Sequence, residues 1–203
     1  MAGSLNKVML IGNLGAIPQS NFKRLLAYSS ISHAGFLLLA LAAGEPAAGL
    51  TPNVVVSFYL GTYLLMTLLS FLIMVIVRNS SANDDLSAFD GLSSRSPFLA
   101  FALLIAAASL AGVPLTAGFF GKFFAILLAA GTHHWFLLAL AVLGAAAGFY
   151  YYFKIVRSMY WNAPAADAPA LSYTALSRAS IVLLTALTLL LGVYPKPLLA
   201  LLQ

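Results

Sequence analysis

Residues 109–123 of the chain are SLAGVPLTAGFFGKF, and they lie in the middle of an apolar segment, Pro97–Gly131, that carries a single charge. A straight helix over the whole segment would be about 50 Å long, whereas the hydrocarbon core of a bilayer is about 30 Å thick. Pro114 removes a backbone hydrogen bond, and the nearby Gly112 and Gly118 make unwinding easier. We therefore predict a discontinuous helix that is broken near Gly112–Gly118, at mid-membrane depth.

The composition of the whole chain supports a membrane location. Of its 203 residues, 62% are apolar and 7% are charged, whereas soluble domains carry about 25% charged residues. The formal net charge of +5 is not gathered on one stripe, which argues against a nucleic-acid-binding surface. The sequence has no cysteine and no nucleotide-binding or nucleophile motif. It therefore carries no signature of thiolate-held clusters, bound nucleotides or acyl-enzyme chemistry.

Five apolar stretches are long enough, or nearly so, to cross a membrane, and they predict an all-α membrane protein with about five transmembrane helices. All five acidic residues lie between these stretches. Lys and Arg are concentrated before the first stretch and around the connections after the second and the fourth. Because short loops rich in Lys and Arg stay in the cytoplasm, this pattern predicts that the C-terminus lies outside. The predicted traverses are Leu25–Ala43, Val54–Val77, Pro97–Gly131, Trp135–Phe153 and Ile181–Val193 with its flanks.

Lys122 is the single charge of the broken segment. It precedes the next polar turn by about ten residues, which corresponds to about 15 Å and therefore to the bilayer centre. A lysine at that depth costs about 2.5–3.5 kcal/mol on insertion scales and usually serves ion or proton movement. The alternative is a lysine that snorkels to the interface, but its stem of about 6 Å is too short for that distance. We predict that Lys122 transfers protons.

Two further candidates for proton transfer lie in or beside the first traverse. His33 lies inside it and, at helical spacing, shares a face with Ser29 and Ser30, which favours a polar ladder that holds water. The alternative for His33 is a packing role, with a hydrogen bond to a carbonyl of a neighbouring helix. Lys23 and Arg24 precede the traverse. They are most simply interfacial anchors, and the second interpretation makes Lys23 a proton relay on the cytoplasmic side.

Three consecutive tyrosines, residues 150–152, lie close to Lys154 near the end of the fourth traverse. Tyrosine gathers at membrane–water interfaces because its ring is apolar and its hydroxyl group is polar. We therefore predict that this run forms an aromatic belt at the interface.

Four segments of the chain resemble the antiporter-like membrane subunits of respiratory complex I, most closely subunit N. The first is NFKRLLAYSSISHAGF at residues 21–36. The second is the stretch at 109–123, which resembles the broken helix of those subunits. The others are YYYFK at residues 150–154 and LGVYP at residues 191–195. The resemblance extends over about residues 10–203.

In that family two inverted repeats of five helices are followed by a final helix, and buried Lys, Glu and His residues with water cross the membrane midplane. The resemblance implies that Lys122 exchanges protons toward the outside and that Lys23 and His33 belong to the helix that begins with the Lys-Arg pair. It also implies a subunit of a proton-translocating NADH–quinone oxidoreductase in the bacterial inner membrane. NADH, flavin, iron–sulfur clusters and quinone would then belong to partner subunits, with no cofactor in this chain.

Members of that family have many more traverses, so the resemblance makes this chain a fragment: the second repeat and the final helix, without the N-terminal half of the same subunit. We expect an N-terminal stub at 1–20, which is either a truncated helix or an unrelated start. An antiporter-like repeat of four spans (21–161), a cytoplasmic loop (162–176) and a final transmembrane helix (177–203) follow. Residues 1–15 also resemble the first strand of bacterial single-stranded DNA-binding proteins, but they are too short to form the barrel that a nucleic-acid partner needs.

Two other functions stay open at this point. Related subunits of multi-subunit cation/proton antiporters and of membrane hydrogenases share the broken helix, so the chain could belong to such a complex. The other alternative is a non-functional truncated remnant, in which Lys122 has no role.

Overall fold

The structure is a computed structural model that describes residues 2–44, 46, 49–133, 135–165 and 168–202. Every regular element within these ranges is a helix, which confirms the predicted all-α membrane class. Two of the acidic residues predicted to lie in connections, Glu45 and Asp167, fall outside the described residues. The helices are α1 (Ala2–Ala16), α2 (Phe22–Ala43), α3 (Pro52–Ser81), η1 (Leu86–Phe89), α4 (Leu92–Arg95), α5 (Pro97–Ala111), α6 (Ala117–Gly131), α7 (Trp135–Trp161), α8 (Ala175–Val193) and α9 (Lys196–Leu202).

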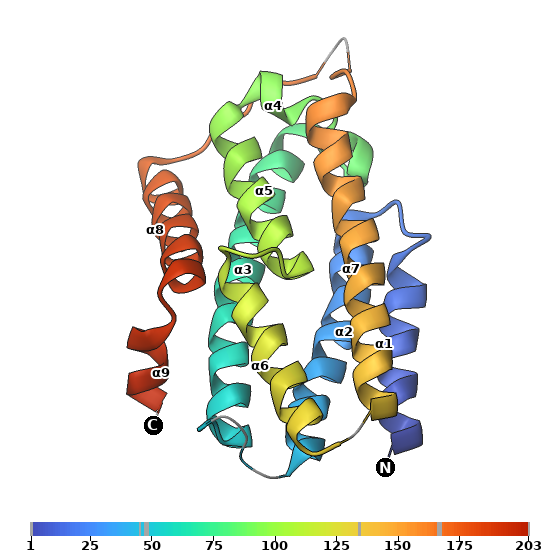
Figure 1. Cartoon of the computed structure of the whole chain (residues 1–203). Coiled ribbons are helices and arrows are strands. Elements are labelled where there is room, and N and C mark those ends of the chain that lie inside the picture. Colours follow the sequence, from blue (N-terminus) through green and yellow to red (C-terminus); the bar gives the residue numbers. More distant parts are fainter. Residues whose placement is uncertain (1, 45, 47–48, 134, 166–167, 203) are drawn as a thin grey trace.

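The predicted traverses correspond to long helices that run roughly along one common direction (Figure 1). By length and composition, α2, α3, α7 and α8 can each cross a membrane. The remaining traverse consists of α5 and α6, two apolar helices of 15 residues each. Figure 1 shows that α6 continues the course of α5 after a short irregular connection. The structure thus confirms about five traverses, with the break in the third.

Polar side chains at the loop ends set where the main helices begin. The Asn21 side chain accepts a hydrogen bond from the backbone N–H of Arg24, which satisfies a donor that has no partner inside α2. These caps set the first residue of each helix, so that α3 begins at Pro52 instead of Val54; at its other end α3 continues to Ser81, beyond the predicted Val77. The same capping role is taken by Thr51 in α3, Ser96 in α5 and Thr174 in α8.

The N-terminal segment forms the helix α1, and not the strand that residues 1–15 resemble in single-stranded DNA-binding proteins. It packs very closely against α2. A Cβ atom added to Gly12 would lie 2.4 Å from the Ser32 nitrogen, and one added to Gly15 would lie 2.2 Å from the Tyr28 ring. Asn13 is buried in this contact and accepts a hydrogen bond from the Ser32 hydroxyl group. Small residues let two helix backbones approach in this way, so α1 is part of the bundle.

The last part of the chain, predicted as one helix over 177–203, is divided in two. α8 ends at Val193 and α9 begins at Lys196, because Pro195 disfavours a helical conformation of the residue before it. α7 ends at Trp161 and α8 begins at Ala175, within the range 162–176 that was predicted as a loop. Gly192 brings α8 against the connection between α5 and α6, since a Cβ atom there would lie 2.3 Å from the Thr116 Cα atom. The end of α8 therefore packs directly against the broken helix.

Candidate functional site

Lys122 is buried at the break between α5 and α6. Its Nζ atom donates hydrogen bonds to the carbonyl oxygens of Leu110 and Ala111, at 2.8 and 2.9 Å. In an unbroken helix the Leu110 carbonyl would accept from residue 114, but Pro114 has no N–H group. The ammonium also lies 5.4 Å from the centre of the Phe36 ring in α2, and only 6% of the residue is exposed. The charge is therefore held by backbone groups that the break leaves without helical partners.

The backbone of the break depends on two glycines. Gly112 has a φ of 89°, which is unfavourable for residues with a side chain, and a Cβ atom there would lie 3.0 Å from the Cδ atom of Lys122. A Cβ atom at Gly118 would lie 1.9 Å from the Ser109 carbonyl oxygen. The Gly118 N–H group instead donates to the Ser109 hydroxyl oxygen at 3.0 Å, which joins the start of α6 to the end of α5. These contacts fix where α6 presents Lys122.

His33 lies between two buried tyrosines that come from different helices. Its Nδ1 atom is 2.8 Å from the hydroxyl oxygen of Tyr59 in α3, and its Nε2 atom is 3.1 Å from that of Tyr152 in α7. The Tyr152 hydroxyl group also forms a hydrogen bond with Ser29, one turn before His33. A neutral imidazole has one donor and one acceptor nitrogen, so it can join the two hydroxyl groups in one chain. We call Ser29, Tyr152, His33 and Tyr59 the imidazole chain.

The imidazole chain lies beside Lys122. A Cβ atom added to Gly121, the residue before Lys122, would lie 3.0 Å from the ring of Tyr59. The same tyrosine stacks on Phe36, whose ring faces the Lys122 ammonium. Ammonium, imidazole and hydroxyl groups can all give up or accept a proton. Among the residues that the structure describes, no three His, Asp or Glu side chains gather to hold a metal ion. Proton transfer is the chemistry that this set of groups supports.

Sequence reasoning missed Tyr59 and misassigned the tyrosines at 150–152. Tyr151 and Tyr152 are each only 1% exposed, so the predicted aromatic belt is wrong for these two residues, whereas Tyr150 is 59% exposed. Consecutive residues of a helix point about 100° apart, so three adjacent tyrosines cannot all face the interface. That geometry was the available signal, because at least one of the three had to face the bundle.

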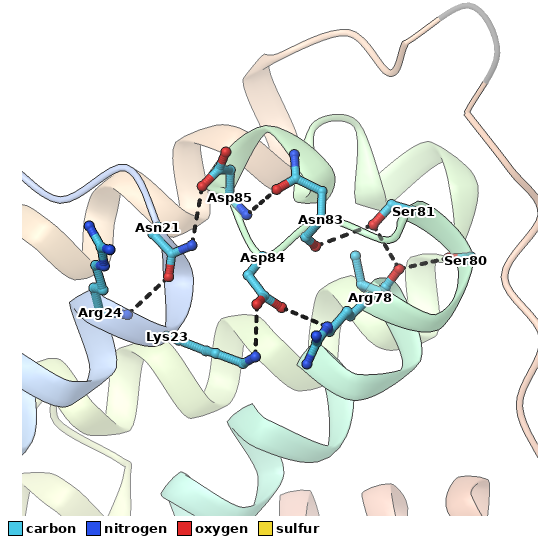
Figure 2. Close-up of polar contacts among 10 residues, drawn as sticks. Asn21, Lys23, Arg24, Arg78, Ser80, Ser81, Asn83, Asp84 and Asp85 are labelled. Carbon is cyan, nitrogen blue, oxygen red and sulfur yellow. Dashed lines mark hydrogen bonds and ion pairs between the residues drawn. The ribbon is translucent and has the colours of Figure 1, made fainter.

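Lys23 lies away from this buried set, at the end of the bundle that carries the basic loops. Its Nζ atom is 2.7 Å from Asp84 in the connection after α3, and 39% of its side chain is exposed. Arg78 contacts the other oxygen of the same carboxylate at 3.2 Å. Figure 2 shows Asp84 between these two cations, with the Asn21 cap of α2 next to them. The pair links the start of α2 to the end of α3.

The sequence matches a known family over most of its length. The model of the NADH:quinone oxidoreductase/Mrp antiporter transmembrane family matches residues 6–148. The chain belongs to this family. The match begins within α1 and runs through the broken helix into α7, so it includes Lys23, His33 and Lys122.

Individual members of the NADH:quinone oxidoreductase/Mrp antiporter family are close in sequence. NADH-quinone oxidoreductase subunit N 2 of Solibacter usitatus (strain Ellin6076) is 44% identical over 196 residues, which are 96% of this chain and 39% of that protein. The protein with the same name in Solidesulfovibrio magneticus is 41% identical over 94% of this chain, again 39% of the relative. The chain therefore spans about two fifths of the length of these relatives.

Solved structures of similar membrane chains confirm the fold. A chain of respiratory complex I from Thermus thermophilus with bound aureothin superposes with a TM-score of 0.82 at 35% identity, covering 97% of this chain and 43% of that one. A chain of the membrane-bound sulfane sulfur reductase, an archaeal respiratory membrane complex, superposes with a TM-score of 0.86 at 26% identity, covering 98% and 40%. The bundle is thus an antiporter-like membrane fold, and the chain is a multi-pass membrane protein.

Proposed function

We propose that this chain is the proton-translocating part of an antiporter-like subunit N in a NADH–quinone oxidoreductase. The observation that carries the proposal is the position of Lys122. It is buried at a break in a membrane-crossing helix and is hydrogen-bonded to the Leu110 and Ala111 carbonyl oxygens. Ionisable groups inside a membrane are costly and usually serve ion or proton movement, and broken helices are where transporters place such sites.

Lys122 and the imidazole chain have different roles in the proposed proton transfer. In its amine form Lys122 accepts a proton, and as an ammonium it is stabilised by the two carbonyl oxygens at the end of α5. His33 passes protons between the hydroxyl groups of Tyr152 and Tyr59, and the Tyr59 ring packs against Gly121, the residue before Lys122. For Lys23 we propose an anchoring role through Asp84 at the aqueous end of the bundle, rather than a place in this relay.

The driving force comes from redox chemistry in other subunits. The relatives are named as subunits of NADH-quinone oxidoreductase, so we propose that NADH, flavin, iron–sulfur clusters and quinone are bound by partner subunits. The partners are then hydrophilic and membrane subunits of the complex. They include a polypeptide or segment equivalent to the part of subunit N that precedes this region in its relatives.

We further propose an orientation in the bacterial inner membrane. Lys23, Arg78 and Asp84 gather at one end of the bundle, whereas the start of α1 and the end of α9 lie toward the other end (Figure 1). Because basic residues are retained in the cytoplasm, the first end faces the cytoplasm and the C-terminus faces outward.

The test is NADH-driven proton uptake by inverted membrane vesicles that contain the assembled complex. We expect Lys122→Met to lower the rate of pumping by about 100-fold or more, the scale of a lost acid–base group. Lys196→Met is the matched control, because Lys196 is exposed at the start of α9. NADH oxidation is recorded in the same vesicles, so loss of turnover is told apart from loss of pumping. Normal pumping by Lys122→Met would overturn the proposed function.

The same experiment separates the second candidate, a cation/proton antiporter subunit. One observation favours it: the family model that matches this chain includes Mrp antiporters. Sodium-dependent proton movement without NADH oxidation would replace the proposed function by this one. A chain that co-purifies with no redox subunit and moves no ions would instead be the non-functional remnant.

A further inference from the structure

One face of α7 carries three polar residues and a glycine. They run from the end of the bundle with the basic loops toward Lys122, which lies in the neighbouring helix α6. Ser158, Lys154, Tyr151 and Gly148 are spaced by four, three and three residues, and residues three or four apart in a helix lie one above the other. His33 and the imidazole chain are reached instead from Tyr152, one residue further along. The proposed function assigns no role to the face of α7 that carries Tyr151.

The upper end of this face opens into a polar cavity of about 280 Å³. Asp90, Lys154, Arg157 and Ser158 contribute to its lining. The Ser158 hydroxyl group donates to Asp90 Oδ1 at 2.5 Å, and the Asn162 side chain donates to the same oxygen at 2.8 Å. A volume of this size with several polar partners is ample for water.

Lys154 repeats the arrangement of Lys122. Its Nζ atom donates to the carbonyl oxygens of Ile17 and Gln19, at 2.9 and 2.8 Å, where the chain leaves α1. An ammonium group has three donors, so two bonds to carbonyls leave one hydrogen for the cavity or for the next group on the face. Lys122 is thus held by carbonyl groups at the end of α5, and Lys154 by carbonyl groups just after the end of α1. Of the two lysines, Lys154 lines the cavity.

The lower end of the face brings Tyr151 and Lys122 together. A Cβ atom added to Gly148 would lie 3.5 Å from the hydroxyl oxygen of Tyr151 and 3.9 Å from the Nζ atom of Lys122. Both groups therefore border the space beside this glycine, where water can lie between them. The Tyr151 side chain is buried, so its hydroxyl group has been removed from the lipid as well as from bulk water.

We propose that this face of α7 is a proton path between the polar cavity and Lys122, with Lys154 and Tyr151 as the transfer groups. This path rests on the proposed function. It would connect Lys122 to the aqueous end of the bundle that carries the basic loops. Through intervening water, Lys154 passes a proton to the Tyr151 oxygen and takes one from the cavity, while the Tyr151 hydroxyl proton passes to the Lys122 amine. Lys154 and Tyr151 each end with the protons they began with, and Lys122 gains one.

Three variants of the assembled complex interrupt the path at different points. Tyr151→Phe keeps the ring and removes the hydroxyl group. Lys154→Arg keeps a cation that can donate to the Ile17 and Gln19 carbonyls, but arginine does not release a proton. Gly148→Leu fills the space between Tyr151 and Lys122. We expect each to slow proton pumping relative to NADH oxidation, Tyr151→Phe by about 100-fold, the lower end of the effect of a lost acid–base group. Tyr150→Phe is the matched control, because the neighbouring tyrosine is 59% exposed.

A second readout separates transfer from packing. If Tyr151 transfers protons, the slower pumping of Tyr151→Phe shows a larger solvent deuterium isotope effect than wild type, at unchanged thermal stability of the complex. A variant that loses stability and NADH oxidation in proportion to pumping contradicts the path. Should Gly148→Leu fail to assemble, Tyr151→Phe decides.

The outcome for Lys122→Met distinguishes the two levels of the account. If Lys122→Met abolishes pumping while Tyr151→Phe and Lys154→Arg assemble and pump like wild type, the path along α7 is wrong and the proposed function stands. If Lys122→Met itself pumps normally, the proposed function fails, and the path fails with it.

Discussion

Lys122 shows how a single residue can keep a charge inside a membrane. Its ammonium group costs about 2.5–3.5 kcal/mol on insertion scales, but it satisfies two carbonyl groups that would each cost about 1–3 kcal/mol if left unpaired. We therefore predict that Lys122→Leu changes the stability of the purified subunit by less than about 2 kcal/mol in either direction, since the two effects offset each other. Thermal unfolding in detergent measures this. A large stabilisation would mean that the carbonyl bonds contribute little.

Tyr152 is the residue on which the imidazole chain depends. Its hydroxyl group contacts both Ser29 and His33, so Tyr152→Phe leaves two buried polar groups with one partner fewer. We predict a loss of about 1–3 kcal/mol in unfolding free energy. Tyr150→Phe, one residue earlier and exposed, is the control and is expected to have little effect. Equal unfolding midpoints for the two variants would show that the hydroxyl group of Tyr152 is not a structural partner.

The residue scale also shows what sequence could reveal about the site. Lys122 was found because a charge in a long apolar segment has no ordinary explanation, and His33 because a polar group lies inside a predicted traverse. Tyr59 and Tyr152 could not be assigned in the same way, because tyrosine is common at membrane interfaces and its role depends on which helix it faces. The contacts that join them to His33 come from three helices that are distant in sequence.

Among the helices, the break between α5 and α6 makes the site. We predict that Gly118→Ala lowers the unfolding midpoint strongly and reduces pumping, because its Cβ atom would lie 1.9 Å from the Ser109 carbonyl oxygen. Gly61→Ala in α3 is the matched control. Its Cβ atom would lie no closer than 3.8 Å to the nearest side chain, and alanine favours a helix over glycine by about 1 kcal/mol. If Gly118→Ala and Gly61→Ala behaved alike, the close approach of α6 to Ser109 would be wrong.

The same scale explains which helices could be predicted from sequence. The length of Pro97–Gly131 against the thickness of a bilayer left only tilting, folding back or breaking, and Pro114 with its nearby glycines favoured the break. The place of α1 in the bundle could not be predicted. Its 15 residues are too few to cross a bilayer alone, and its packing depends on Gly12 and Gly15 meeting the backbone and ring of α2.

For the molecule as a whole, the proposed orientation can be measured because the chain has no cysteine. Asn53 and Ser172 are exposed, the first near the start of α3 and the second in the connection before α8, at the basic end. We predict that Ser172→Cys reacts with a membrane-impermeant thiol reagent only in inverted vesicles, and Asn53→Cys only in right-side-out cells. The reverse labelling pattern would show the opposite orientation in the membrane, with the C-terminus in the cytoplasm.

The assembly is tested by mild-detergent purification of the chain from its host membrane. From the proposed function, and because the chain spans 39% of its relative from Solibacter usitatus, we predict that the remaining part of the subunit co-purifies with it, together with flavin and iron–sulfur subunits. Purification of this chain by itself would support the remnant instead.

The most direct test of the account is the number of protons pumped per NADH oxidised by the reconstituted complex with Lys122→Arg. Arginine keeps a positive charge with donors for the two carbonyl oxygens at the end of α5, but it does not release a proton. If Lys122 is a proton-transfer group, the ratio falls even though the complex assembles and oxidises NADH. An unchanged ratio would show that Lys122 serves only to hold the broken helix.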